Sequence, residues 1–322
     1  MKELLESSGV LGFIDTHEAF HIVGHKEPDG DCVGSQLALA SLLERLGKKV
    51  QLLSAGPFDR TEIAGFAGRF ESTCTVFDGY AAAVIIVDCS SVSRIGSIAD
   101  SLPANLPMAF IDHHAAGEVS GDVRFVDAGA PAVTCLVQSI IEAYGQPTVG
   151  EAGLLLFGLC TDTGFFRHLD GASGDVFRQV SRLVDAGASP KEAHALMYGG
   201  KPLASRQLMG MLLGRVKPYY DGKLLFTSMD LEDQKRFGFA SRDSDMLYQM
   251  LLTVEEMEVA VVVRQESGTE CTVGFRSRNS VDVASIAASF GGGGHRLAAG
   301  LHLRGSLEEV SQKIIEAFVS VF

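Results

Sequence analysis

Short apolar runs alternate with helical patterns through the first half of the chain, and this alternation constrains the fold more than any other feature. FHIVG (20–24) precedes a helical pattern over 35–47, and KVQLL (49–53), AAVIIVD (82–88) and PMAFID (107–112) are further runs with few charges. Runs this continuously apolar are typical of parallel strands in a sheet that helices cover on both faces. The sequence therefore predicts an α/β domain with a doubly wound, mainly parallel sheet.

The second half of the chain has a different pattern. The segment VKPYYDGKLLFTSMD (216–230) has the form of a hairpin that turns at Asp221-Gly222, and strand patterns follow over 257–264 and 271–277. The second half ends with a helical pattern, a run of four glycines, and a last strand and helix. This order of elements predicts a smaller α+β domain. The expected bounds are 1–188 for the first domain, 189–204 for a linker and 205–322 for the second domain.

The charge balance limits the class of ligand. The net charge is −13, whereas proteins that follow long nucleic acids usually carry a broad basic surface. Residues 271–305 are a local exception, because their charged side chains are four arginines and the single acid Asp282. The pattern favours a small anionic substrate over long nucleic acid.

Membrane insertion and disulfide bonding are both disfavoured. No apolar run approaches the roughly 18–20 residues of a membrane span, and the N-terminal segment is unlike a secretory signal, so we expect a cytoplasmic protein. The six cysteines include no C-x-x-C pair, which argues against a disulfide framework and a thiolate zinc site. We expect them to be small buried residues, although Cys32 and Cys89 each directly follow a candidate ligand.

Acidic and imidazole side chains gather where the predicted strands end. The carboxyl ends of parallel strands meet at one edge of a sheet, so we expect these groups to lie close together. The apolar segment around 153–164 brings one more acid to that edge. The candidates are His25, Asp29 and Asp31 after the first run, Asp88 after the third, Asp112, His113 and His114 after the fourth, and Asp162.

Such a cluster predicts a metal site. Crowded carboxylates repel unless cations neutralise them, and imidazole with carboxylate but without thiolate suits manganese or another octahedral divalent ion. The donors exceed the needs of one ion, and two ions that share a carboxylate are a common device for hydrolysing phosphate esters. Taken singly, the acids of PDGD could form a turn, His25 could be structural and Asp88 could cap a helix. Their occurrence together at four segment ends argues against these alternatives.

A second candidate site lies in the second domain. Arg276 and Arg278 alternate onto one face of a strand, and guanidinium groups bind phosphate in a bidentate manner. The run GGGGH (291–295) lets backbone N–H groups approach an anion closely, although glycine runs also serve as flexible connectors. We expect substrate binding by Arg276, Arg278, Gly292, Gly293, Gly294 and His295.

These residues carry a family resemblance. HKEPDGDCVGS (25–35), VDCS (87–90), IDHH (111–114) and CTDTG (160–164) resemble, in order, the four motifs of the DHH phosphoesterases. The segment 274–300 is similar to the DHH-associated C-terminal domain and its GGGH signature. The resemblance covers essentially the whole chain.

The resemblance implies a role for each residue of the first site. One ion would be held by His25 and Asp29, and the other by Asp31, His113 and Asp162, with Asp88 as the bridge. Asp112 would orient the histidines, and His114 would face the scissile phosphate or its leaving oxygen. Arg94 could bind phosphate or simply lie on the surface.

The resemblance also implies an activity. The chain has the length and the domain pair of family members that hydrolyse short oligoribonucleotides and 3′-phosphoadenosine 5′-phosphate. The resemblance implies two Mn²⁺ ions as cofactors, with Mg²⁺ or Co²⁺ as possible substitutes. The substrate would bind in a cleft between the domains, the second domain would hold its terminal nucleotide, and the linker would allow opening. A homodimer is plausible for this family.

Four alternatives stay open at this point, three of them other substrates and one a non-catalytic protein. The substrate could instead be a linear dinucleotide such as pGpG or pApA, a cyclic dinucleotide, or pyrophosphate. The pyrophosphatases of the family carry a different C-terminal domain, and its membrane-bound cyclic-dinucleotide hydrolases carry transmembrane and sensor regions not seen here. A non-catalytic nucleotide-binding protein should have lost metal ligands, and none of the six is missing.

Overall fold

The structure is a computed structural model that describes residues 2–114, 121–238 and 243–322. The chain divides into two compact units, Met1–Gly200 (unit 1) and Lys201–Phe322 (unit 2), so the division falls within the expected linker range. Part of that range forms a helix of unit 1, α9 (Pro190–Tyr198), whose buried Ala193 belongs to the core of that unit. Among the described residues, no helix combines the length and apolarity that crossing a membrane requires.

Unit 1 contains the predicted doubly wound parallel sheet. Its strands run in the order β2-β1-β3-β4-β5 and every pair is parallel. The register pairs Val23 with Leu53 and Ile86, and Val87 with Ile111, so the strands end at one edge. The strands are β1 (Ala19–Val23), β2 (Lys49–Leu53), β3 (Ala82–Val87), β4 (Met108–Asp112) and β5 (Val123–Val126).

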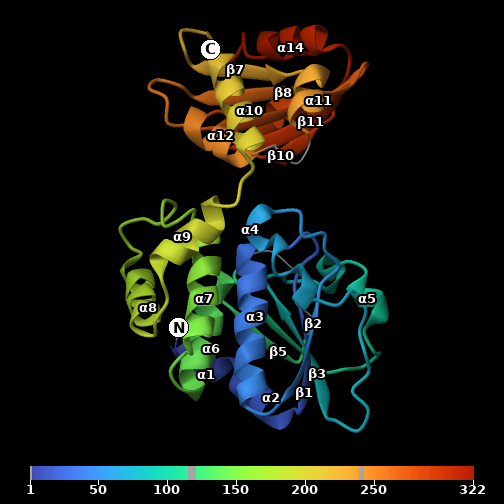
Figure 1. The fold of residues 1–322 in the computed structure, drawn as a ribbon, viewed down its shortest axis with the longest axis vertical. Coiled ribbons are helices and arrows are strands. Elements are labelled where there is room, and N and C mark those ends of the chain that lie inside the picture. The colour runs from blue at the N-terminus through green and yellow to red at the C-terminus, as the bar shows by residue number, and fades with distance from the viewer. Residues whose placement is uncertain (1, 115–120, 239–242) are drawn as a thin grey trace. The chain divides into compact units, whose positions relative to one another are not determined.

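Helices cover both faces of this sheet (Figure 1). One face packs against α3 (Gly30–Arg45), α6 (Val133–Tyr144) and α7 (Val149–Asp162), where the larger core lies. The other face packs against η2 (Val92–Ile95) and α5 (Ile98–Ser101). The remaining elements of unit 1 are α1 (Lys2–Ser8), α2 (Val10–Thr16), α4 (Thr61–Ala64), η1 (Ala67–Arg69) and α8 (Gly174–Asp185).

Side chains specify where the helices begin. In α7, Thr148 and Glu151 form a capping box, in which each side chain accepts a hydrogen bond from the other residue's backbone N–H. In α3, the Asp29 carboxylate accepts hydrogen bonds from the backbone N–H groups of Asp31 and Cys32. The turn that joins β1 to α3 is therefore fixed by one of the candidate metal ligands.

Unit 2 is the predicted α+β domain, with a mixed sheet in the order β10-β11-β9-β8-β7-β6. Only β7 and β8 pair in parallel. The expected hairpin turns at Asp221-Gly222, where both residues have positive φ. The strands are β6 (Lys217–Tyr219), β7 (Leu224–Met229), β8 (Val259–Ser267), β9 (Glu270–Ser277), β10 (Gly293–His295) and β11 (Ala298–Arg304).

Two separate cores lie on the two faces of this second sheet. One face packs against α13 (Val283–Ser289) and α14 (Leu307–Glu316), and the other against α10 (Leu203–Gly214) and α12 (Ser244–Leu251). The helix α11 (Leu231–Phe237) follows β7. Part of the glycine run is itself a strand, because Gly293 and Gly294 belong to β10 and pair with β11.

Candidate metal centre

His25 and Asp29 lie in the turn between β1 and α3. Nδ1 of His25 donates to the backbone oxygen of Lys26 at 2.8 Å, which leaves Nε2 as the free ring nitrogen. That Nε2 lies 3.9 Å from Oδ1 of Asp29 and 3.4 Å from Oδ2 of Asp88. Burial alone would lower the pKa of His25, but the contacts with these two carboxylates raise it well above its ordinary value. The imidazole and the two acids thus form one electrostatic group.

Asp88 lies between two imidazoles. Oδ2 faces His25, and Oδ1 lies 3.7 Å from Nε2 of His113. The residue follows β3 with a φ of 59°, in the left-handed region that non-glycine residues seldom occupy. Such backbone strain is typical of functional sites. The side chain is 3% exposed, and each of its oxygens faces one of the two imidazoles.

Asp31 is fully buried and links α3 to α6. Its oxygens accept hydrogen bonds from the backbone N–H groups of Val133 (2.6 Å) and Thr134 (2.9 Å), at the start of α6. No side chain of α6 itself caps that end. Burial nevertheless raises the pKa of Asp31, and the nearby charge of Asp29 adds to the effect.

Asp162 is the last residue of α7, and its Oδ2 lies 3.4 Å from Nε2 of His113. Nδ1 of His113 donates to the backbone oxygen of Ala130 at 3.1 Å, so its Nε2 is directed to the carboxylates. One donor atom each from Asp31, His113 and Asp162 lie within 4.8 Å of one another. Burial and then the charges of neighbouring acids raise the pKa of Asp162 to about 9.

Asp112 and His114 form a pair beside this cluster. Oδ1 of Asp112 accepts a hydrogen bond from Nδ1 of His114 at 2.8 Å, and Oδ2 accepts one from the hydroxyl of Ser90. This contact raises the pKa of His114, and together with Ser90 it lowers the pKa of Asp112 despite the burial of that group. The family resemblance implies that Asp112 orients both histidines. Its Oδ1 accepts from the backbone N–H groups of both residues, but of the two rings it contacts only that of His114. The ring of His113 is fixed by Ala130.

The second candidate site divides into two groups of residues. Arg276 and Gly292 line a groove of about 660 Å³ on the face of the unit 2 sheet, whereas Arg278, Gly293, Gly294 and His295 do not line it. The Arg276 guanidinium stacks 4.8 Å above the ring of Tyr248. Gly292 permits close packing, because a Cβ there would lie 2.5 Å from the backbone oxygen of Gly300.

Family comparison accounts for both units. Residues 19–159 match the family model described as "DHH family, N-terminal domain", and residues 221–321 match the DHHA1 domain. A curated relative from Thermus thermophilus, the "Bifunctional oligoribonuclease and PAP phosphatase NrnA", is 30% identical over 303 residues, covering 92% of this chain and 88% of the relative. The chain belongs to the DHH family of phosphoesterases.

Solved structures share the DHH fold seen here. An exopolyphosphatase-related protein from Bacteroides fragilis superposes with a TM-score of 0.82 at 21% identity, over 100% of this chain and 98% of that one. Exonuclease RecJ bound to manganese superposes with a TM-score of 0.51 at 16% identity, over 99% and 94% of the two chains.

The donor chemistry of the DHH unit fits the divalent metals implied by the family. Burial and the charges of Asp31 and Asp29 raise the pKa of Asp88 to about 8, although His25 opposes the shift. Divalent cations at this position would allow the carboxyls to ionise at neutral pH. The histidines fit as well, because in each ligand candidate Nδ1 is engaged by a backbone carbonyl and Nε2 faces the acids. One donor departs from the expected set, since the thiol of Cys32 lies with His25 and Asp88.

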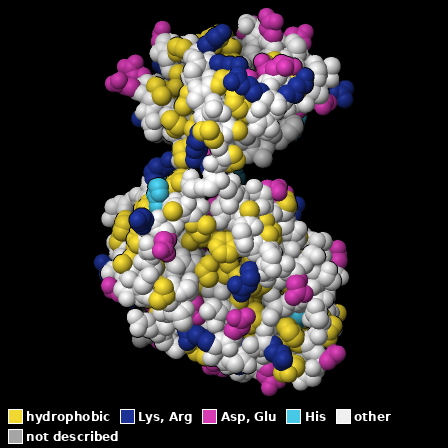
Figure 2. Space-filling model, viewed as in Figure 1, with side chains coloured by type: hydrophobic (Ala, Val, Ile, Leu, Met, Phe, Trp, Pro, Cys, Tyr) yellow, Lys and Arg dark blue, Asp and Glu magenta, His cyan; other side chains and the backbone are white. Residues whose placement is uncertain are grey.

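Sequence reasoning missed four further polar side chains. In the DHH unit, burial would raise the pKa of Asp29, but contacts with His25 and Cys32 lower it and the charge of Arg60 adds to the lowering. Arg60 also opposes the raised pKa of Asp162, and Ser90 donates a hydrogen bond to Asp112. Ser90 lies inside the VDCS motif and could have been found there, but Arg60 is in a loop remote from every motif. Figure 2 shows acidic and basic side chains interspersed over the visible face of unit 1.

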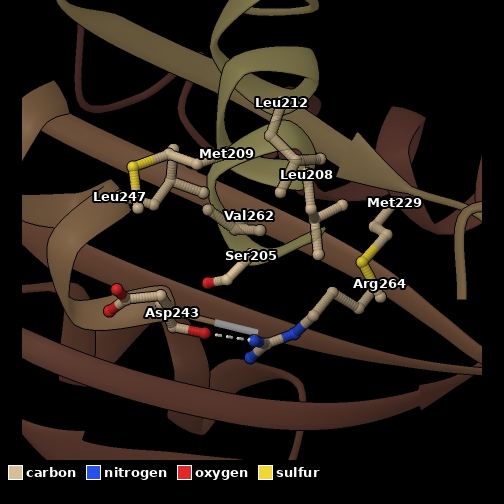
Figure 3. Close-up of a pocket in the computed structure, with 10 residues that line it drawn as sticks. Ser205, Leu208, Met209, Leu212, Met229, Asp243, Leu247, Val262 and Arg264 are labelled. Atoms are coloured by element: carbon tan, nitrogen blue, oxygen red, sulfur yellow. Dashed lines mark hydrogen bonds between the residues drawn. The ribbon is translucent and has the colours of Figure 1, made fainter. Parts of the chain in front are cut away.

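The other two missed side chains lie in the DHHA1 unit. Tyr248 and Arg264 both line the groove beside Arg276, and the Tyr248 hydroxyl and the Arg264 Nε have no hydrogen-bond partner within the described chain. Nη1 of Arg264 donates to Ser244 at 2.6 Å, at the polar end of a small, mainly apolar cavity of about 20 Å³ (Figure 3). Arg264 could have been identified from the sequence, because it places a positive charge at the end of the apolar run VAVVVR (259–264).

Proposed function

We propose that this DHH phosphoesterase hydrolyses short oligoribonucleotides and 3′-phosphoadenosine 5′-phosphate with the help of two divalent metal ions. The observation that carries the proposal is the placement of the buried Asp88 carboxylate between His25 and His113, one facing each oxygen. The choice of substrates is supported by the relative from Thermus thermophilus, whose name gives both activities.

We infer how the ions would be shared. His25 and Asp29 would hold one ion, and Asp31, His113 and Asp162 the other, with Asp88 as a ligand to both. Mn²⁺ is the ion that we expect, because oxygen and imidazole donors suit it and RecJ, which shares the fold, was solved with manganese. Mg²⁺ and Co²⁺ are the alternatives. When bound, such ions activate a water molecule and neutralise charge on the phosphoryl oxygens.

His114 is the proposed proton donor to the leaving oxygen. Its Nδ1 is bonded to Asp112, so the ring is held in one orientation and Nε2 is left for the substrate. The His114 side chain is 41% exposed, whereas Asp112 is completely buried behind it. Asp112 is thus a positioning residue, and Ser90 supports it from the far side. Arg60 and Arg94 add positive charge that would attract phosphate, since their charges act on Asp162 and on His114, respectively.

The DHHA1 unit would contribute to substrate binding. We infer that Arg276 and the backbone at Gly292 bind the substrate, because both line the groove. Arg278, Gly293, Gly294 and His295 stay predictions from the sequence. Homodimer formation and a cytoplasmic location also stay predictions, of which the first can be measured by light scattering.

A substrate panel tests the proposal. The purified protein would be incubated with Mn²⁺ and with each of pApA, pGpG, 3′-phosphoadenosine 5′-phosphate, a cyclic dinucleotide and pyrophosphate, and the products separated by length. We expect mononucleotides from the linear dinucleotides and AMP from the nucleotide bisphosphate. Turnover of only the cyclic dinucleotide or only pyrophosphate would replace the proposed substrates with those alternatives.

Two variants control the panel. Asp88→Ala should abolish every turnover, whereas Asp78→Ala, which changes an exposed acid outside the cluster, should leave turnover unchanged. Full activity of Asp88→Ala would refute the assignment of the centre. Tight binding of a dinucleotide by the wild-type protein with Mn²⁺, but without product, would show a nucleotide-binding protein instead.

A further inference from the structure

Cys32 brings a sulfur atom to the candidate metal centre. Its Sγ, a ring nitrogen of His25 and a carboxylate oxygen of Asp88 all lie within 4.8 Å of one another. Cys32 lies in the first turn of α3, directly after Asp31, and is completely buried. The His25 side of the centre therefore has a nitrogen, an oxygen and a sulfur donor within reach of a single ion.

The end of β1 makes room for this sulfur. A Cβ on Gly24 would lie only 2.1 Å from Sγ of Cys32, so any larger residue at position 24 would displace the thiol. The thiol donates a weak hydrogen bond to the Gln36 side-chain oxygen at 3.6 Å, and it also interacts with the ring of His25. Gln36 is held by the backbone oxygens of Ile22 and Leu53, each at 3.0 Å. The sulfur is thus fixed in place by packing and keeps lone pairs available to a metal.

The two other donors are oriented independently of the sulfur. Nδ1 of His25 is bonded to the backbone of Lys26, and Nε2 lies 3.4 Å from Oδ2 of Asp88. A nitrogen, oxygen and thiolate set is borderline-soft, which suits Zn²⁺, Cd²⁺ or Co²⁺ better than Mn²⁺ or Mg²⁺. Hard ions would bind through the oxygen and imidazole donors and leave the sulfur protonated.

We propose that Cys32 makes the His25 side of the centre a binding site for thiophilic divalent ions, with His25, Asp88 and the Cys32 thiolate as ligands. When the ion binds, the S–H bond breaks, its proton passes to solvent and a sulfur–metal bond forms, without any oxidation. The inference rests on the proposed metal centre and adds ion selectivity to it. Zn²⁺ and Cd²⁺ would displace Mn²⁺ from this side and inhibit hydrolysis.

Absorption spectroscopy tests the proposal without relying on activity. The metal-free full-length protein would be titrated with Co²⁺ and, separately, with Cd²⁺. We expect a sulfur-to-metal charge-transfer band in the near ultraviolet. The intensity of the band should reach its maximum when the tighter of the Co²⁺ or Cd²⁺ binding steps is complete. Cys32→Ser should lose the band and bind Cd²⁺ at least about tenfold more weakly, while its Mn²⁺ affinity stays within about twofold of wild type.

Cys89→Ser is the matched control, because Cys89 is also completely buried and directly follows Asp88, yet it is not in the donor set. It should keep the band, and a loss there would overturn the assignment to Cys32. Cys32→Ala gives a second test, since it removes the sulfur without introducing a hydroxyl. Co²⁺ binding with visible ligand-field bands but no charge-transfer band would overturn the sulfur ligand alone. Failure of the wild-type protein to bind Co²⁺, Cd²⁺ and Mn²⁺ would refute the metal centre itself.

Discussion

Asp31 accepts a hydrogen bond from the backbone N–H of Val133 at 2.6 Å, although 102 residues separate the two in the sequence. The same carboxylate is a candidate metal ligand. A single buried side chain therefore caps α6 and contributes charge to the centre. Its two roles can be separated by substitution.

Asp31→Asn should lose the charge and keep one of the two hydrogen bonds of the cap. The amide oxygen can accept from only one of the two backbone N–H groups of α6, so the free energy of unfolding of the metal-free protein at about pH 8 should fall by less than in Asp31→Ala. Asp31→Ala should lower it by about 1–2 kcal/mol, because the cap is lost. Urea denaturation in a chelator measures both. Equal destabilisation by the two variants would contradict the capping role.

The metal-free protein should lose stability as the pH rises. The pKa of Asp88 is raised to about 8 and that of Asp162 to about 9, whereas unfolded aspartates titrate near about 4. The folded state thus retains protons that the unfolded state releases, so this stability is present below about pH 4 and is lost as the pH rises to about 9. The raised pKa of His25 acts in the same direction. The lowered pKa of Asp29, about 2, acts oppositely, but only below about pH 4.

Thermal unfolding in a chelator should therefore show a lower Tm at about pH 9 than at about pH 6, and Mn²⁺ should raise the Tm more at the higher pH. The control is the double variant Asp88→Asn/Asp162→Asn. If these two carboxyls cause the pH dependence of the Tm, the Tm of the double variant should change less with pH. Repulsion from the overall net charge of −13 would persist in the variant. An unchanged slope would assign the effect to that overall charge.

Asp112→Asn should lower kcat by about 10²–10⁴-fold with little change in KM, because the neutral amide no longer stabilises the protonated His114 ring that the carboxylate orients. Steady-state kinetics on a dinucleotide measure this split. Ser90→Ala, which removes only the support behind Asp112, should have a smaller effect of the same kind. A change confined to KM would show that Asp112 acts on substrate binding instead.

The sequence predicted the centre better than the groove, for a physical reason. In a parallel sheet, residues that follow strand ends meet at one edge, so His25, Asp88 and Asp112 could be placed together from the apolar runs alone. Arg264 and Tyr248 join Arg276 only through the pairing of β8 with β9 and the packing of α12, which no local pattern reports. The approach of Cys32 to His25 could not be predicted from the sequence either, because it depends on the side-chain geometry of one turn.

The two arginines of FRSR should differ in importance. Arg276 lines the groove, whereas Arg278 lies past the end of β9, where its Nη1 donates to the backbone of Val254 at 3.4 Å. Arg276→Ala should raise KM for a dinucleotide by about 10- to 100-fold, as expected for a lost charge-assisted hydrogen bond. Arg278→Ala, the matched control, should raise it less. Equal effects would show that the substrate lies outside the groove.

Tyr248→Phe separates stability from binding in the groove. Tyr248 is 3% exposed as a residue, and its hydroxyl has no hydrogen-bond partner within the described chain. Removing an unsatisfied buried hydroxyl should leave the free energy of unfolding unchanged or raise it by up to about 1 kcal/mol. If the substrate provides the missing partner, the same variant should raise KM for a dinucleotide by about 3- to 10-fold, with kcat unchanged. Lower stability with unaltered KM would instead indicate a structural partner for the hydroxyl, such as a bound water molecule.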